Sequence, residues 1–292
     1  MNYLDFEKEL EILDKNLEEL QNPFNQEDGL STVQSSKINE IENQIKIKID
    51  EIYSNLDGWK KTMLARHEFR PKAEFYISTI FDNFQKLSGD RNFGEDQSVI
   101  TGFATINEKS VLVIGQEKGH DTESRITRNF GMMKPEGYRK CIRLMRLAEN
   151  YNIPVVTLID TPGAFPGKGA EERGQAEAIA QSINCCLDLK VPIISIVIGE
   201  GGSGGAIALA TSNKVLMLEH AIYSVISPEG CASILWKDAT KSKNAAYAMH
   251  LTAQDLYKNQ IIDQIIEEPK GGAHRNPELM AKVIKGKIYD SI

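Results

Sequence analysis

Residues 191–212 constrain the fold more than any other part of the chain. Residues 191–198 are apolar, short and rich in β-branched side chains, which predicts a strand buried on both faces of a sheet. Five glycines follow within residues 199–205, and the Ala/Ile/Leu-rich residues 205–212 predict a tightly packed helix. Glycines let a ligand approach the main chain closely, and N–H groups at a helix start have no intrahelical acceptor. We therefore expect a main-chain site for standing or developing negative charge after this strand.

Three short motifs match the same glycines, and each predicts a different site. Residues 199–204 fit a dinucleotide fingerprint, with Glu219 at the distance of a ribose-binding acid. Ser203 lies between glycines as in the nucleophile elbow of a serine hydrolase. A hydrolase also needs a histidine, and three follow in the chain: His220, His250 and His274. A P-loop would end in Gly-Lys-Ser/Thr where this chain has Gly204-Gly205-Ala206, so close packing or a main-chain oxyanion hole is favoured instead.

The charge of the chain excludes some partners. Its 292 residues have a net charge of −7, so neither nucleic acid nor an anionic membrane is expected as the main partner. Residues 1–60 contain 14 Asp/Glu and 6 Lys, which leaves the remainder nearly neutral. The acidic start is unlike a targeting signal, and no apolar run approaches about 18 residues, so we expect a cytoplasmic protein. The cysteines lack disulfide or zinc-ligand spacing and are expected to be reduced, buried thiols: Cys141, Cys185, Cys186 and Cys231.

Two amphipathic patterns open the chain. Leucines at helical spacing over residues 3–21 and isoleucines over residues 37–56 predict two helices, joined by a polar loop at residues 22–36. We expect residues 1–60 to form a helical hairpin that serves assembly. Residues 61–292 are then expected to form the main domain.

The main domain alternates strands and helices. His67 lies among charged residues and is expected at the surface or in a salt link, and a helix is predicted through Phe75 and Phe84. Pro154 and Pro192 each introduce an apolar strand, a Gly-containing turn and a helix, which predicts a spiral with two exposed turns at one end of a parallel sheet. The expected elements are strands at 99–106, 111–115, 154–160, 191–198 and 215–218, and helices at 171–187 and over most of 237–292.

A basic segment interrupts this nearly neutral domain. Its members are Arg125, Arg128, Lys134, Arg139, Lys140, Arg143 and Arg146, with Glu136 as the only acid among them. Pro135 and the apolar spacing that follows it predict a helix start there. The segment is either a solvated face that pairs with the acidic N-terminal arm, or a collar for phosphate or carboxylate groups such as those of coenzyme A.

Longer motifs resemble a known family, the alpha subunits of bacterial acetyl-coenzyme A carboxylase carboxyltransferase. The shared motifs are LARH at 64–67, RNFGM at 128–132, PEGYRK at 135–140, IDTPGA at 159–164, GAEERGQ at 169–175, VIGEGGSGGA at 197–206, residues 223–236, and GGAHRNP at 271–277. They span nearly the whole chain, which makes the resemblance more specific than any of the three short motifs. The chain ends at Ile292, before the C-terminal tail expected of many members, which concerns assembly alone.

The resemblance implies a crotonase-like α/β fold built as a ββα spiral, and a complex of two alpha and two beta subunits. It also implies transfer of the carboxyl group from carboxybiotin, on a biotin carboxyl carrier protein, to acetyl-CoA, which gives malonyl-CoA for fatty acid synthesis. Biotin carboxylase would supply the carboxybiotin, and zinc is expected in the beta subunit only, with no metal site in this chain.

The resemblance further assigns roles to particular residues. The N–H groups of Gly204 and Gly205 would hold the biotin oxygen, with Gly201, Gly202, Gly163 and Ala164 shaping the pocket. If the basic segment is a collar for anionic groups, Arg125, Arg128 and Arg139 are expected to contact substrate. The freed biotin nitrogen would act as the base, so no side-chain base is expected, and Ser203 is a turn residue. Another crotonase-fold acyl-CoA enzyme, a serine hydrolase using Ser203, and a non-catalytic scaffold remain as alternatives.

Overall fold

An eight-stranded sheet forms the centre of the protein. The computed structural model describes residues 2–22 and 32–292. Strand order is β1-β2-β3-β4-β5-β6-β8, and β7 pairs with the far end of β5. The β1–β2 and β2–β3 pairs are antiparallel and all others are parallel. The strands are β1 Asp82–Lys86, β2 Val99–Ile106, β3 Lys109–Gln116, β4 Val155–Thr161, β5 Ile193–Gly202, β6 Lys214–Leu218, β7 Ile222–Ser224 and β8 Gln264–Ile266.

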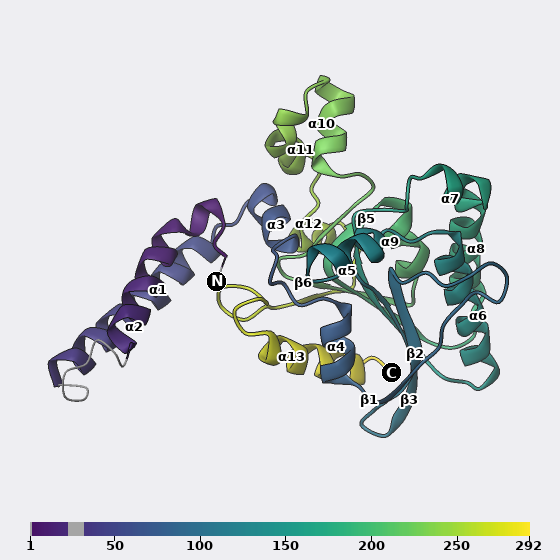
Figure 1. Cartoon of the computed structure of the whole chain (residues 1–292), viewed down its shortest axis with the longest axis horizontal. Helices are drawn as coiled ribbons and strands as arrows, with labels where there is room; N and C mark the ends of the chain where they lie inside the picture. The colour runs from purple at the N-terminus through teal and green to yellow at the C-terminus, as the bar shows by residue number, and fades with distance from the viewer. Residues whose placement is uncertain (1, 23–31) are drawn as a thin grey trace.

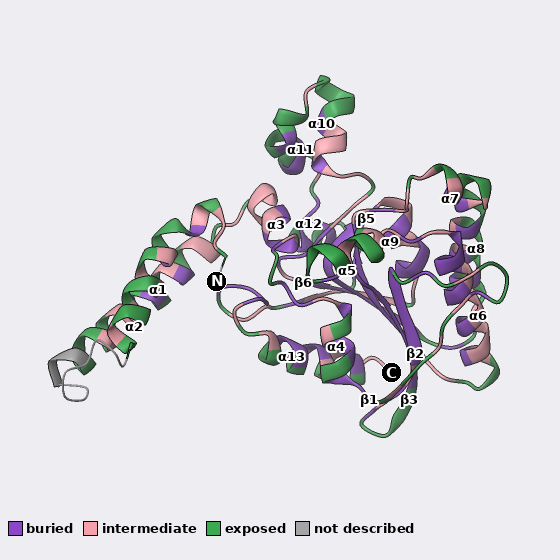
Figure 2. Cartoon of the chain, in the orientation of Figure 1, coloured by how far each residue is buried: buried purple, intermediate pink, exposed green. Residues whose placement is uncertain are grey.

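Strands β4 and β5 form the buried middle of this sheet. Every residue of both is buried, as the continuous apolar runs predict for strands covered on both faces (Figure 2). Helices α6 (Pro135–Asn150) and α8 (Gln175–Asp188) cover one side, while α4 (Ala73–Ile80) and α13 (Pro277–Tyr289) lie on the other (Figure 1). The hairpin β2–β3, the parallel β4 and β5, and the helix after each confirm the predicted spiral.

The other helices connect or extend this core. Residues 228–248 project from the body (Figure 1). The remaining elements are η1 Asp5–Glu7, α1 Lys8–Gln21, α2 Thr32–Tyr53, α3 Gly58–Ala65, α5 Thr122–Thr127, η3 Asn129–Gly131, α7 Lys168–Glu172, α9 Ser203–Ala210, α10 Pro228–Trp236, η4 Ala239–Lys241, α11 Ser242–Ala248 and α12 Ala253–Lys258. No helix in the described part of the chain is long and apolar enough to cross a membrane.

Several predicted boundaries were wrong, and each error has a local cause. Phe84 lies in β1 and not in a helix, because α4 ends at Ile80 and the chain turns into an edge strand paired with β2. The helix predicted at 171–187 is divided between α7 and α8 by Gly174, whose φ of 80° is a left-handed conformation that ends a helix. Strand β8 was missed because it has only three residues.

The N-terminal arm is a helical hairpin that extends away from the sheet (Figure 1). Helices α1 and α2 pack through a small apolar cluster of their own, centred on Leu10, Ile45 and Ile49. Helix α2 begins at Thr32, so the connecting loop is shorter than predicted, and residues 23–31 of that loop lie outside the described residues.

Basic residues near the C-terminus fasten this arm to the body. Arg275 pairs with Asp14 at 3.2 Å, and Lys270 pairs with Asp50 at 2.6 Å. The expected pairing of the arm with basic residues 125–146 was therefore wrong. Those residues lie in α5, in α6 and between them. The ion pairs made by this segment are with other residues of the main domain.

A buried ion pair joins three distant segments of the main domain. Arg70 is 3% exposed and donates to both carboxylate oxygens of Glu268, and its Nε donates to the carbonyl of Ile198 in β5 at 2.8 Å. Glu268 also accepts the N–H of His220 and of Ala273. Burial raises the pKa of Glu268, but the charge of Arg70 outweighs this effect and lowers the pKa to about 2. The pair therefore connects the linker before α4 to the strand that precedes the glycines.

Replacement of Arg70 by Met is expected to lower the free energy of unfolding by about 3–5 kcal/mol, because Glu268 would remain buried without its counter-charge. Arg146→Met is the matched control, since the Arg146–Asp188 pair is exposed and worth about 1 kcal/mol or less. Urea unfolding of both variants measures the difference. Equal losses would show that the Arg70 pair does not join these segments.

Candidate functional site

Two backbone turns meet at the carboxyl ends of β4 and β5. The turn at residues 162–167 follows β4, and the glycine-rich segment ends β5 and begins α9. A Cβ atom on Gly205 would lie 2.5 Å from the carbonyl carbon of Gly163 and 2.8 Å from the nitrogen of Ala164. A Cβ on Gly202 would overlap the carbonyl of Pro162. The structure therefore brings the two turns into direct contact, at positions where only glycine fits.

Three main-chain N–H groups lie at this contact, on Gly204, Gly205 and Ala164. Gly204 and Gly205 lie in the first turn of α9, where the helix itself offers no partner. The N–H of Ala164, in the facing turn, makes no backbone hydrogen bond to any described residue. Gly204 and Ala164 are only partly buried. These donors can therefore bind an oxygen that acquires negative charge, aided by the positive end of the α9 dipole.

Neighbouring polar groups hold both turns in place. Thr161 Oγ1 donates to the carbonyl of Gly163 at 2.7 Å and accepts its N–H at 3.2 Å. Gln116 Nε2, from the end of β3, donates to the carbonyl of Gly205 at 2.8 Å. Gly201 lies inside β5 and packs against the ring of Tyr223 in β7. It therefore helps to hold the end of β5, where the glycine-rich segment leads into α9.

The side chains that a hydrolase or a dehydrogenase would use are elsewhere. Ser203 has a φ of 52°, a left-handed conformation at a strand-to-helix turn, yet its hydroxyl makes no hydrogen bond to any described residue. Each candidate histidine has another neighbour: His220 lies against Tyr53, His250 against Asp255 and His274 against His67. Glu219 accepts the N–H of Glu268 at 3.2 Å. Neither constellation is assembled.

The three arginines considered for substrate contact point to different places. Arg128 pairs with Glu74 at 3.0 Å, and Arg139 pairs with Asp90 at 2.9 Å. Arg125, on α5, lines a cavity of about 360 Å³ beside Pro162. Only Arg125 therefore faces the space next to the two turns.

A network of charges forms the wall of this cavity. Lys118 contacts Asp160 at 2.8 Å and Glu200 at 3.2 Å, and Arg66 contacts Glu200 at 2.6 Å. Burial raises the pKa of Glu200, but the charges of Lys118 and Arg66 outweigh this effect and hold the pKa below its ordinary value. No sequence motif assigned a role to Lys118, Asp160, Glu200 or Arg66. Asp160 and Glu200 could have been found as acids at the carboxyl ends of adjacent parallel strands, but no sequence signal marks Lys118 as their partner.

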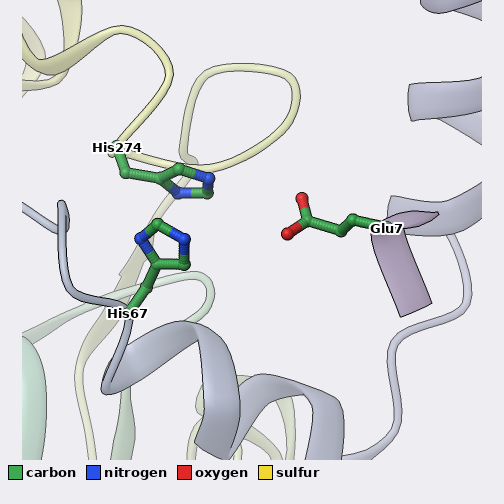
Figure 3. A group of neighbouring side chains, drawn as sticks. All are labelled: Glu7, His67 and His274. Atoms are coloured by element: carbon green, nitrogen blue, oxygen red, sulfur yellow. The ribbon is translucent and has the colours of Figure 1, made fainter. Parts of the chain in front are cut away.

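A second polar cluster lies where the N-terminal arm joins the body (Figure 3). Glu7, His67 and His274 place possible ligand atoms within 4.8 Å of one another. His67 donates from Nε2 to the carbonyl of Asn2 and accepts the N–H of Phe69 at Nδ1, so neither ring nitrogen has a free lone pair. This arrangement fits a clamp on the arm and does not fit a metal centre. The expectation that His67 is at the surface or in a salt link was wrong, since it is 5% exposed and stacks on His274 at 4.1 Å.

Three of the four cysteines match their expected setting. Cys141, Cys185 and Cys186 are buried free thiols, whereas Cys231 is only partly buried because α10 projects from the body. Burial raises the pKa of the Cys186 thiol to about 12, which keeps it protonated and inert.

The histidine clamp predicts a loss of stability in mild acid. Burial, followed by the charge of His67, lowers the pKa of His274 from 6.5 to about 3. Between these values the unfolded chain binds a proton that the folded chain does not, so stability is full above about pH 6.5 and falls with decreasing pH. At pH 5.5 the expected loss is about 1.4 kcal/mol.

His274→Phe keeps the stacked ring and cannot titrate, so its unfolding free energy should depend less on pH between 7 and about 5. His120→Phe is the control, because the His120 side chain is 75% exposed. Urea unfolding at several pH values checks this. A pH slope for His274→Phe equal to that of the wild type would contradict it.

The contact between the turns predicts opposite outcomes for adjacent glycines. Gly205→Ala should lower the unfolding free energy by about 1–3 kcal/mol, because its methyl group would push the turns apart. Gly204→Ala should be neutral or stabilising by up to about 1 kcal/mol, since its methyl group would lie 3.6 Å from Ile179 and alanine favours helices. Chemical denaturation measures both. Similar effects at the two positions would show that the turns are not in contact.

Known proteins are similar to this chain in sequence. The chain is 61% identical over 291 residues to the acetyl-coenzyme A carboxylase carboxyl transferase subunit alpha of Pelagibacter ubique (strain HTCC1062), covering 100% of this chain and 79% of that protein. It is 53% identical over 284 residues to the subunit of the same name from Paramagnetospirillum magneticum (strain ATCC 700264 / AMB-1), covering 97% and 89%.

Solved structures share the fold. A transcarboxylase 12S structure matches with a TM-score of 0.59 at 18% identity, over 76% of this chain and 44% of that one. The beta subunit of geranyl-CoA carboxylase from P. aeruginosa matches with a TM-score of 0.59 at 16% identity, over 80% of this chain and 44% of that one. The chain thus spans under half of each longer chain, and these likenesses support the crotonase-like fold.

The family comparison covers almost the entire sequence. The family model described as acetyl co-enzyme A carboxylase carboxyltransferase-like matches residues 3–292. Together with the relatives above, this match shows that the chain belongs to the acetyl-coenzyme A carboxylase carboxyltransferase alpha-subunit family.

Proposed function

We propose that this chain forms one half of an active site in which main-chain N–H groups, and not side chains, stabilise the reaction. The chain transfers a carboxyl group from carboxybiotin, presented by a biotin carboxyl carrier protein, to the methyl carbon of acetyl-CoA, and the product is malonyl-CoA. The observation that supports this most strongly is that the N–H groups of Ala164, Gly204 and Gly205 lie where the two turns meet, the last two in the first turn of α9.

The chemistry of the transfer explains why such donors are needed. Biotin supplies the carboxyl group as its N–C bond breaks, and its ureido nitrogen takes the proton that the methyl carbon loses as the new C–C bond forms. Negative charge therefore develops on the ureido oxygen. The N–H groups of Gly204, Gly205 and Ala164 would bind this oxygen, and one such donor typically contributes about 10² to 10³ in rate. No side-chain base from this chain is required.

The second charged species implies a partner. The thioester oxygen of acetyl-CoA also becomes negative, and it needs donors that cannot be the ones already occupied by biotin. We infer that a beta subunit supplies them in an alpha2beta2 complex, and that this subunit holds the zinc. The four cysteines of this chain lack zinc-ligand spacing. Biotin carboxylase would regenerate carboxybiotin, and the complex would act in the cytoplasm in fatty acid synthesis.

Arg125 is the proposed contact for an anionic group of acetyl-CoA. It lines the cavity beside Pro162, whereas Arg128 and Arg139 are already neutralised by Glu74 and Asp90. Guanidinium groups bind phosphate with two parallel hydrogen bonds, which suits this role. The collar expected from the sequence is thereby reduced to one residue.

Gly204→Val tests the proposal directly, with Ser203→Ala as its adjacent control. The valine side chain would cover the N–H groups at the start of α9, so malonyl-CoA formation should fall by about 10² or more in a complex that still assembles. Ser203→Ala should stay within a few-fold of the wild type. The assay mixes the chain with its beta subunit, acetyl-CoA and carboxylated biocytin, and size-exclusion chromatography follows assembly.

The same pair of variants separates the alternatives. A serine hydrolase would lose activity with Ser203→Ala and keep it with Gly204→Val. A non-catalytic scaffold would leave a fully active complex with either variant. Another crotonase-fold acyl-CoA enzyme would turn over acyl-CoA without any need for carboxylated biocytin.

A further inference from the structure

We propose that Asp160 is a positioning residue that, together with Lys118, sets the distance between the two turns bearing the N–H donors. This inference rests on the proposed function of those donors and adds a residue that acts on them through the backbone. Asp160 is the penultimate residue of β4, one residue before the end of the strand, and is 4% exposed.

The carboxylate of Asp160 reaches across from β4 to β5. Its Oδ1 accepts the N–H of Glu200 at 2.9 Å. Oδ1 also lies 2.5 Å from where a Cβ of Gly199 would be, so the carboxylate occupies the space that this glycine leaves. The contact replaces a strand-to-strand bond with a side-chain bond at the position just before the glycine-rich turn.

The sheet needs such a connection at this position. Strands β4 and β5 pair in regular register up to Ile159 and Val197, and then the register shifts before Thr161 meets Gly201. Backbone pairing is therefore interrupted between these two points, and no backbone pair is made at Asp160 itself. Asp160 lies within this irregular interval and spans it, so it determines how Ala164 faces Gly205.

Lys118 holds the carboxylate in place. It lies just after β3 and contacts Asp160 at 2.8 Å and Glu200 at 3.2 Å, while Arg66 binds the other side of Glu200. Two carboxylates so close to each other would repel without this ammonium group between them. The network therefore fixes the ends of β3, β4 and β5 relative to one another.

Fold stability alone does not favour such a network. A buried ion pair contributes little net stability, because the desolvation of its charges offsets their attraction, and apolar side chains of similar volume often serve as well. The network lies directly below the two turns and on the cavity wall beside Pro162. Its position suits a role in geometry, because a displacement of about 1 Å in a reacting site can lower the rate by about 10².

The test compares Asp160→Ala, Asp160→Asn and Asn213→Ala in the chain reconstituted with its beta subunit. Asn213 is the matched control, because its Oδ1 accepts the N–H of Ile193 at 2.8 Å at the opposite end of the same strand β5. We expect Asp160→Ala to lower kcat by about 10², with KM for biocytin and for acetyl-CoA changed by about twofold or less. Asp160→Asn retains an oxygen that can accept the N–H of Glu200, so it should restore kcat to within about tenfold of the wild type. Asn213→Ala should leave kcat unchanged.

Lys118→Met provides a second route if Asp160→Ala does not fold. It leaves Asp160 in the chain but removes the charge that orients it, so kcat should fall at least about tenfold, again without a matching rise in KM. A merely structural role predicts lower melting temperatures with wild-type kcat in the folded fraction, for Asp160 and Lys118 variants alike, and that result would overturn the inference. A change confined to KM would overturn it as well, because it would make these residues substrate contacts.

The outcome remains distinguishable from failure of the proposed function. If the N–H groups are not the donors, Gly204→Val retains activity whatever Asp160 does. If Gly204→Val is inactive and a folded Asp160→Ala has the wild-type kcat, the donors stand and the positioning role of Asp160 is excluded.

Discussion

The close contact between two backbone turns is the constraint on which the site depends. Gly205 in α9 and the Gly163–Ala164 peptide in the turn after β4 approach so closely that no side chain fits between them. This approach places the N–H groups of Gly204, Gly205 and Ala164, from two different segments, within one small region. A donor set of this kind costs little reorganisation when charge develops, because the sheet has already fixed it in place.

The rest of the fold serves this contact. Strands β4 and β5 are buried along their whole length, so their ends cannot move independently of the core. Gln116 holds the carbonyl of Gly205 from β3, and Arg70 ties β5 to Glu268 in the C-terminal segment. The acidic arm of residues 1–60 is anchored to the body through His67, Arg275 and Lys270, and its helices α1 and α2 extend away from the sheet (Figure 1).

The sequence predicted strands β2 to β6, the two turns and their shared end of the sheet, because apolar runs that stop at glycines are local signals. It did not predict which polar side chains meet there. Lys118 and Asp160 are distant in the chain, and their contact depends on strand order, which no local pattern records. The ion pairs of Arg128 and Arg139 could not be predicted for the same reason. Their acidic partners, Glu74 and Asp90, come from segments far away in the sequence. His67 was misplaced because its charged neighbours in sequence suggested solvent, whereas the arm covers it.

The central claim is that main-chain amides bind the oxygen of biotin on which charge develops. The most direct measurement is a structure of the chain with its beta subunit and bound biocytin. The account predicts the ureido oxygen at about 2.7–3.1 Å from the nitrogens of Gly204, Gly205 or Ala164. A ureido oxygen bound instead by a side chain, or located away from the contact between the two turns, would contradict it.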